Sequence, residues 1–107
     1  MSNVIGMVSF YLKNGVSKQE FLLAHEKYNR EFVSKQKGYI SHKLAANGDK
    51  WTDFVMWASI DDTQKTFEAV QENSTATHMM SLIDQIGTDD DIPLFSVVRD
   101  YDLVEGV

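Results

Sequence analysis

Apolar residues follow a strand-like pattern at the start of the chain and a helical period directly after it. The run VIGMVSFYL, residues 4–12, is almost wholly apolar and rich in β-branched and aromatic residues, which predicts a strand buried on both faces. A Ser-Lys-Gln-Glu capping box at 17–20 predicts the start of a helix that extends to about Gln36. The buried stripe of this helix recurs every three or four residues and consists of Phe21, Ala24, Tyr28 and Phe32.

The rest of the chain predicts three more strands and a broken second helix. Residues 38–45 and 51–60 are two predicted strands, joined by a loop that begins with an Asn-Gly turn signal and is longer than two residues. A helix with an acidic first turn begins at 61 and is broken at 73–75. Its second piece carries the helically spaced Met79, Leu82, Ile83 and Ile86, and the last strand is predicted over 94–103.

This order, β-α-β-β-α-β, predicts a ferredoxin-like α+β fold: a four-stranded antiparallel sheet with both helices on one face. We expect a single domain over 1–107, with its core between 4 and 103. In the first and third strands, the residues that would point to either face of the sheet are apolar, whereas a sheet with one open face should alternate apolar and polar residues. A second copy would cover that face, so we predict a homodimer, a dimeric α+β barrel.

Composition limits the classes of function. The chain has 107 residues, of which 43% are hydrophobic and 24% charged, as in an ordinary globular domain. A net charge of −6 without a basic stripe disfavours a nucleic-acid partner. No apolar run is long enough to cross a membrane, and the start of the chain has no signal-peptide pattern, so we expect no membrane association and a cytoplasmic location. With no cysteine, the chain has no thiolate metal ligand.

Several short motifs follow one another in the middle of the chain. Gly38-Tyr39 opens the second strand, and Trp51-x-Asp53 leads to Trp57-x-Ser59 and an acidic helix start. In these residues the sequence resembles the antibiotic-biosynthesis-monooxygenase-like group of the dimeric α+β barrel superfamily. The resemblance implies a cofactor-independent monooxygenase that oxidises an aromatic or quinol-like small molecule in a pocket that excludes water. Such an enzyme needs no cofactor and no metal, only a group that removes or stabilises a phenolic proton.

The resemblance leaves two alternatives open. One is a non-catalytic dimeric protein that binds a small apolar ligand. The other is a haem-binding or haem-degrading member of the superfamily, which would use a histidine in the second helical region and an asparagine in the first strand. His78 lies in that helical region, but Val8 stands nearest the asparagine position, so we expect weak haem binding.

Candidate chemistry borders the buried stripe of the first helix. His25 and Asn29 lie four residues apart on the flank that faces the sheet, and we predict His25 as a base that titrates near neutrality. The alternative is a half-buried histidine that a neighbour satisfies. Trp57 is predicted to stack on a flat ligand, with a simple core position as the alternative. The predicted catalytic residues are His25 and His78, and the predicted substrate-binding residues are Tyr28, Asn29, His42 and Trp57.

Charged residues near the end of the chain are interpreted as structural. Arg99 needs a partner if it lies in a strand, and Asp53 or an acidic group of a second subunit is the predicted one. The acidic run at 89–91 lacks the interleaved spacing of a calcium loop, and no metal-spaced histidine pair occurs, so the sequence predicts no metal site. His42 points either into the same pocket as His25 or toward a dimer interface.

Overall fold

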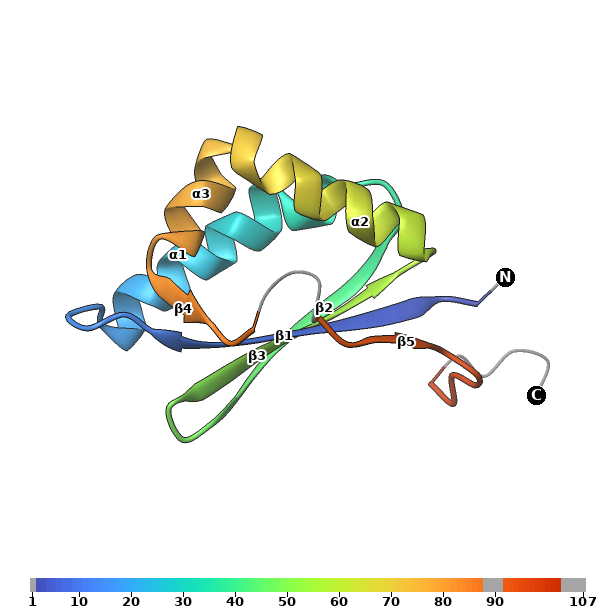
Figure 1. Ribbon diagram of the computed structural model, residues 1–107, viewed down its shortest axis with the longest axis horizontal. Helices are drawn as coiled ribbons and strands as arrows, with labels where there is room; N and C mark the ends of the chain where they lie inside the picture. The colour runs from blue at the N-terminus through green and yellow to red at the C-terminus, as the bar shows by residue number, and fades with distance from the viewer. Residues whose placement is uncertain (1, 88–91, 103–107) are drawn as a thin grey trace.

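In the described part of the chain, three helices lie on one face of an antiparallel sheet and none lies on the opposite face (Figure 1). The computed structural model describes residues 2–87 and 92–102. The elements are β1 (Val4–Leu12), α1 (Lys18–Glu31), the 3-10 turn η1 (Val33–Lys35), β2 (Tyr39–Asn47), β3 (Lys50–Trp57), α2 (Ile60–Ala69), the 3-10 turn η2 (Val70–Glu72), α3 (Ser74–Met80), β4 (Ile83–Gln85) and β5 (Leu94–Ser96).

The sheet has the order β2-β3-β1-β4, which confirms the ferredoxin-like α+β prediction. β4 and β5 share the fourth strand position, because both pair antiparallel with β1, β4 along residues 10–12 and β5 along residues 4–6. Between them, the Ile86 N–H donates to the Ser9 carbonyl and the Met7 N–H to the Pro93 carbonyl. The fourth strand is therefore one position in the sheet, filled by two separate segments.

Two predicted boundaries in this region are wrong. The second helical piece was expected to extend to Ile86, but α3 ends at Met80 and Ile83 begins β4. Its apolar spacing fits a helix, but main-chain pairing with β1 places this segment in the sheet instead. The last strand, predicted over 94–103, ends at Ser96 within the described residues, and Leu103 lies outside them.

The first helix begins where the sequence predicts and ends earlier. The Ser17 hydroxyl accepts from the Glu20 N–H at 3.0 Å, which confirms the capping box. The regular helix stops at Glu31, five residues before the predicted end, and η1 follows it. The hairpin is also tighter than expected: Asn47 pairs with Lys50, so the turn has two residues, and Gly48 takes a left-handed φ of 62°.

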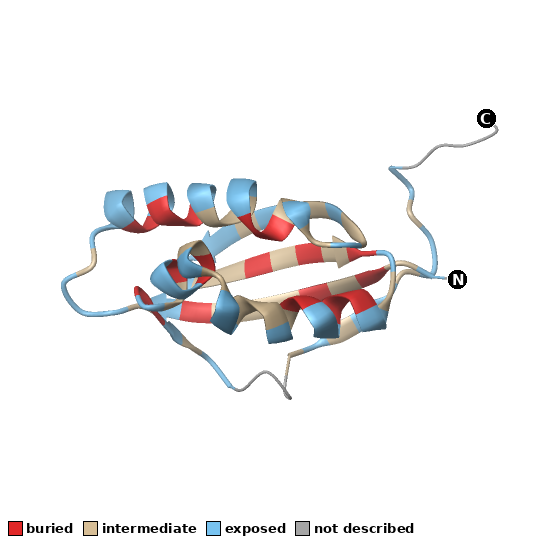
Figure 2. Ribbon diagram, turned by 90° about the horizontal axis from the view of Figure 1, so that it is seen from above, coloured by how far each residue is buried: buried red, intermediate tan, exposed pale blue. Residues whose placement is uncertain are grey.

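The core lies between the helices and the sheet, where buried positions alternate along the central strands (Figure 2). One apolar cluster surrounds Phe10, Phe21 and Met79, and a second surrounds Phe32, Val55 and Trp57. The side chains of Asp53 and His25 are buried in this same layer. These polar side chains are therefore enclosed among apolar neighbours and require hydrogen-bond partners there.

The outer face of the sheet carries apolar side chains on the central strands β1 and β3 and no helix in the described part of the chain. Met7 pairs with Phe54 and Ile5 with Met56 on this face, and all four are half-buried. Polar groups also lie on this face: the hydroxyls of Ser9 and Thr52 are 2.9 Å apart, and the edge strand β2 adds Ser41 and Lys43. None of the described helices is long and apolar enough to cross a bilayer.

Candidate functional site

Asp53 is the centre of a buried polar cluster. Trp51, Asp53, Val55 and Trp57 share one parity of β3, so the strand alternation turns the Asp53 carboxylate toward the helices. The residue is only 6% exposed. A buried carboxylate without partners is strongly destabilising, so its surroundings must supply hydrogen-bond donors.

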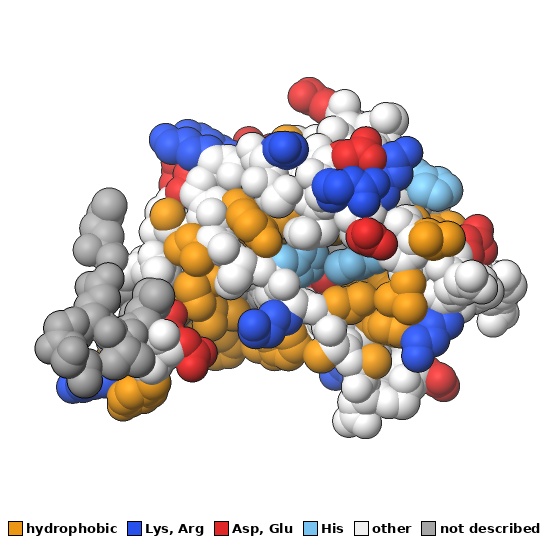
Figure 3. Space-filling model, turned by 180° about the vertical axis from the view of Figure 1, so that it is seen from behind, with side chains coloured by type: hydrophobic (Ala, Val, Ile, Leu, Met, Phe, Trp, Pro, Cys, Tyr) orange, Lys and Arg blue, Asp and Glu red, His pale blue; other side chains and the backbone are white. Residues whose placement is uncertain are grey.

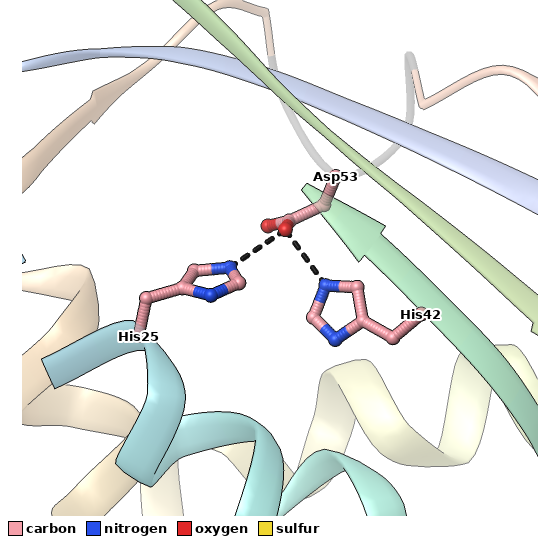
Figure 4. Close-up of side chains that lie close together, drawn as sticks. All are labelled: His25, His42 and Asp53. Atoms are coloured by element: carbon pink, nitrogen blue, oxygen red, sulfur yellow. Dashed lines mark hydrogen bonds and ion pairs between the residues drawn. The ribbon is translucent and has the colours of Figure 1, made fainter. Parts of the chain in front are cut away.

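Two histidines supply these donors (Figure 4). The Nε2 atoms of His25, from α1, and of His42, from β2, each lie 2.7 Å from the same oxygen, Oδ1 of Asp53. An ionised carboxylate only accepts hydrogen bonds, so both Nε2 atoms carry the proton and donate. Asn29 extends the chain of contacts, since its Oδ1 lies 2.7 Å from Nδ1 of His42. His25 and Asn29 are one helical turn apart and so reach the cluster from the same face of α1.

The environment favours the ionised form of Asp53. Burial by itself would raise the pKa of the carboxyl, because it penalises the charge. The hydrogen bonds from His25 and His42, together with their Coulomb attraction, outweigh burial and lower the pKa below the ordinary value of 3.8. At neutral pH the cluster therefore holds a carboxylate between two imidazole rings.

Aromatic packing fixes the rings of the cluster. The His25 ring lies 5.4 Å from the Phe21 ring and 5.8 Å from the Tyr28 ring, in tilted and edge-on arrangements. The two histidine rings lie 5.1 Å apart. The side chain of His25 is 8% exposed and that of His42 only 3%, so both rings are surrounded by protein atoms, which restrict their orientation.

A cavity of about 450 Å³ opens beside this cluster, between the sheet and the helices. Its volume suits a small organic ligand. Two members of the cluster, His42 and Asp53, line its wall, and Trp57 and Tyr28 line it as well. Figure 3 shows histidine side chains in a hollow next to hydrophobic side chains. Most of the remaining wall is apolar: Val8, Val33, Val55, Phe67, Val70, Met79, Met80, Ile83 and Ile92.

The structure brings five of the six residues predicted for the site into one region. Tyr28, His42 and Trp57 line the cavity, and His25 and Asn29 lie next to its wall, hydrogen-bonded to Asp53 and His42. His78 is not among them. It is exposed on α3 and borders a separate shallow depression together with residues of α1.

Asp53 is the site residue that the sequence analysis did not assign to the site. It was considered only as a partner for Arg99, but the structure pairs it with two histidines and leaves Arg99 exposed. One signal was available: Asp53 is a carboxylate at the inward parity of a strand whose other inward residues are large and apolar. The acidic run at 89–91 lies outside the described residues.

The same cluster has the composition of a metal site. His25, His42 and Asp53 each offer one ligand atom, and these atoms all lie within 4.8 Å of one another. The spacing of the three residues in the sequence does not reveal this, because they come from α1, β2 and β3.

No protein-family model matches the sequence, and no curated protein matches it at significant similarity. Solved structures do match the fold. SnoaB, a cofactor-independent oxygenase from Streptomyces nogalater, has a TM-score of 0.72 at 15% identity, over 94% of this chain and 98% of SnoaB. A candidate antibiotic biosynthesis monooxygenase from Chloroflexus aurantiacus has a TM-score of 0.64 at 12% identity, over 94% of this chain and 97% of its own. The chain thus has the ferredoxin-like α+β fold of these monooxygenase-like domains.

Proposed function

We propose that the protein is an enzyme of the cofactor-independent monooxygenase type, acting on a small aromatic, quinol-like substrate. The observation that carries the proposal is the ionised Asp53 carboxylate, hydrogen-bonded to His42, at the wall of a mostly apolar cavity. The cavity is not filled by aromatic side chains, which favours an enzyme over a purely structural role. The fold shared with SnoaB is consistent with this activity.

The overall reaction balances without a cofactor. A quinol and O₂ give a hydroxyquinone and water: one oxygen atom replaces a ring hydrogen as a hydroxyl, and the other leaves as water. The four electrons that O₂ accepts come from the substrate, two from the ring hydroxylation and two from oxidation of the quinol. The protein must therefore bind the ring, exclude water and remove a phenolic proton, which makes the ring electron-rich.

Each of these tasks has a residue beside the cavity. The phenolic proton passes to the Asp53 carboxylate, which lines the cavity and whose two histidine partners already carry a proton on Nε2. The Trp57 indole and the Tyr28 ring provide flat surfaces for an aromatic ligand. His25 and Asn29 do not line the cavity and act as positioning residues, through Asp53 and His42 respectively.

Haem chemistry has less support from this arrangement. Val8 lines the cavity at the position where the haem-degrading pattern needs an asparagine, and His78 borders a different depression. Neither residue offers the cavity a group that the haem reaction requires.

The test is oxygen consumption with a panel of quinols, followed by mass spectrometry of the product formed under ¹⁸O₂. We expect one labelled oxygen in the product, and Asp53→Asn and His42→Gln should each lower kcat/KM by about 10²-fold or more. Asp84→Asn is the matched control, because it removes an exposed carboxylate outside the cavity and should leave the rate unchanged. Saturable quinol binding without oxygen uptake would instead indicate the non-catalytic binding protein.

We also propose that two chains associate through the outer faces of their sheets. The apolar pairs of β1 and β3 on that face, Met7 with Phe54 and Ile5 with Met56, support this. A second copy of the same face is the simplest cover, because a self-complementary patch closes in a two-fold dimer.

A further inference from the structure

We propose that His25, His42 and Asp53 form a binding site for a borderline divalent cation, of which Zn²⁺ is the representative. The three residues come from α1, β2 and β3 and converge with their ligand atoms within 4.8 Å of one another. Two imidazole nitrogens and one carboxylate oxygen are a common ligand set for catalytic zinc and for non-haem iron.

The ligand chemistry selects the class of cation. Calcium and magnesium prefer six or more oxygen ligands, and this cluster offers one carboxylate. Soft cations such as copper(I) prefer sulfur, and the chain has no cysteine. Imidazole nitrogen with a single carboxylate suits zinc, iron(II), cobalt(II) and nickel(II) instead.

The side chains are already close to the geometry that a cation needs. Both Nε2 atoms lie 2.7 Å from Oδ1 of Asp53, so the three ligand atoms are already gathered in one place. Zn–N and Zn–O bonds of about 2.1 Å at the tetrahedral angle would place neighbouring ligand atoms about 3.4 Å apart. Small side-chain shifts therefore convert the hydrogen-bonded cluster into a coordinated one, in which the cation replaces the two Nε2 protons.

Asn29 provides the support that a metal-binding histidine requires. Histidines that ligate a metal through one nitrogen donate the other N–H to a fixed acceptor, which sets the ring orientation. Oδ1 of Asn29 faces Nδ1 of His42 at 2.7 Å and is such an acceptor, leaving Nε2 for the cation. For His25 the contacts are of another kind: the rings of Phe21 and Tyr28 pack against its imidazole and restrict its orientation.

The cavity gives the cation room for further ligands. His42 and Asp53 line the 450 Å³ cavity, so the open side of the three-residue site faces it. Three protein ligands with an open position are typical of a site that binds water or a substrate oxygen, rather than of a closed structural site.

The inference does not depend on the proposed oxygenation. Zinc affinity is measured without any substrate, so the cation site can stand if no quinol is oxidised. The two proposals meet in one consequence: zinc would bind Oδ1 of Asp53, the carboxylate that we assign to proton transfer, and would therefore inhibit the oxygenation. Oxygenation without zinc binding would refute the cation site alone.

The experiment is a titration of Zn²⁺ into the metal-free full-length protein in competition with a chromogenic chelator. We expect one zinc per chain for the wild type, with no competition from an excess of Mg²⁺. Asp53→Asn, His25→Gln and His42→Gln should each weaken zinc binding by at least 10²-fold. Asn29→Ala keeps all three ligands and should weaken it about 10-fold to 10²-fold. His78→Ala and Asp84→Asn are the matched controls, since each removes one exposed group outside the cluster.

Two further measurements make the result decisive. Near-ultraviolet circular dichroism of each metal-free variant shows whether it is folded. If a ligand variant is not folded, the result rests on Asn29→Ala, which keeps all three ligands. Cobalt(II) should give a visible spectrum in the wild type that is lost in Asp53→Asn. A wild type that binds less than one zinc per chain, or site variants that bind zinc as tightly as the controls, would overturn the site.

Discussion

At the scale of single residues, the charge of Asp53 is the feature that most constrains the protein. The carboxylate is 6% exposed and its Oδ1 accepts two hydrogen bonds from imidazole N–H groups. Hydrogen bonds to a charged acceptor contribute about 1.5–3 kcal/mol each, and they are lost or weakened if the charge is removed. The histidines therefore stabilise the ionised carboxyl in the folded state, and the carboxyl in turn fixes both rings.

Acid should weaken the contribution of the Asp53 carboxylate to the free energy of unfolding. Because the pKa of Asp53 is lowered in the folded state, its stabilising effect is present above the unfolded value of 3.8 and is lost as pH falls through the folded pKa. We expect Asp53→Asn to lower the free energy of unfolding by about 2 kcal/mol at neutral pH, and this difference should shrink below the unfolded value. Denaturant unfolding of both proteins across this pH range measures it. A difference that grows toward acid would contradict the assignment, and Asp84→Asn should differ little from wild type at any pH.

His25 should affect the rate constant rather than substrate binding. Its ring contacts Asp53 but does not line the cavity, so it reaches the substrate only through the carboxylate. We expect His25→Ala to lower kcat by about 10²-fold with KM little changed, because misplacement of a catalytic group affects the transition state. His25→Gln, which can still donate to Asp53, should recover part of the rate. Steady-state kinetics on the two variants test this. A rise in KM as large as the expected fall in kcat would instead place His25 in substrate binding.

At the scale of elements, local signals decided what the sequence could predict. The bounds of β1 and the start of α1 follow from an apolar run and a capping box, both of which act over a few residues. β4 escaped prediction because Leu82, Ile83 and Ile86 have a spacing that fits a helix, and only pairing with distant β1 places this segment in the sheet. Long-range contacts also explain why the role of Asp53 was not predicted, since its partners lie 28 and 11 residues away in the sequence. His25 and Asn29 were found because helical periodicity alone turns them toward the sheet.

The N-terminal cap of α1 offers a direct test of this local control. Ser17→Ala removes the hydroxyl that accepts from the Glu20 N–H, and such a loss destabilises by about 1 kcal/mol. For a domain of this size we expect the melting temperature to fall by about 4–8 °C. Ser17→Asp keeps an acceptor and should melt close to the wild type. Thermal denaturation of the three proteins separates the cap from a general effect of substitution, which would lower both variants alike.

At the scale of the whole molecule, the sheet carries apolar side chains on both faces, and the described helices cover one of them. Phe54 and Met7 pair on the open face, and each is half-buried in a single chain. Both central strands present apolar side chains on this face, so leaving it in water would forfeit about 25 cal/mol for each Å² of apolar surface that could be covered. Association through the open face removes that surface from water without changing the helical layer or the cavity on the other side.

We therefore expect light scattering at micromolar concentration to give about twice the chain mass of 12.2 kDa. Phe54→Asp places a charge in the middle of the proposed interface and should give a folded monomer, because burying that charge without a partner is unfavourable. Leu23→Asp is the matched control: Leu23 is 64% exposed on α1, away from the open face, and the variant should remain a dimer. A wild type that scatters as a monomer, or a Phe54→Asp variant that stays dimeric, would show that this face is not the interface.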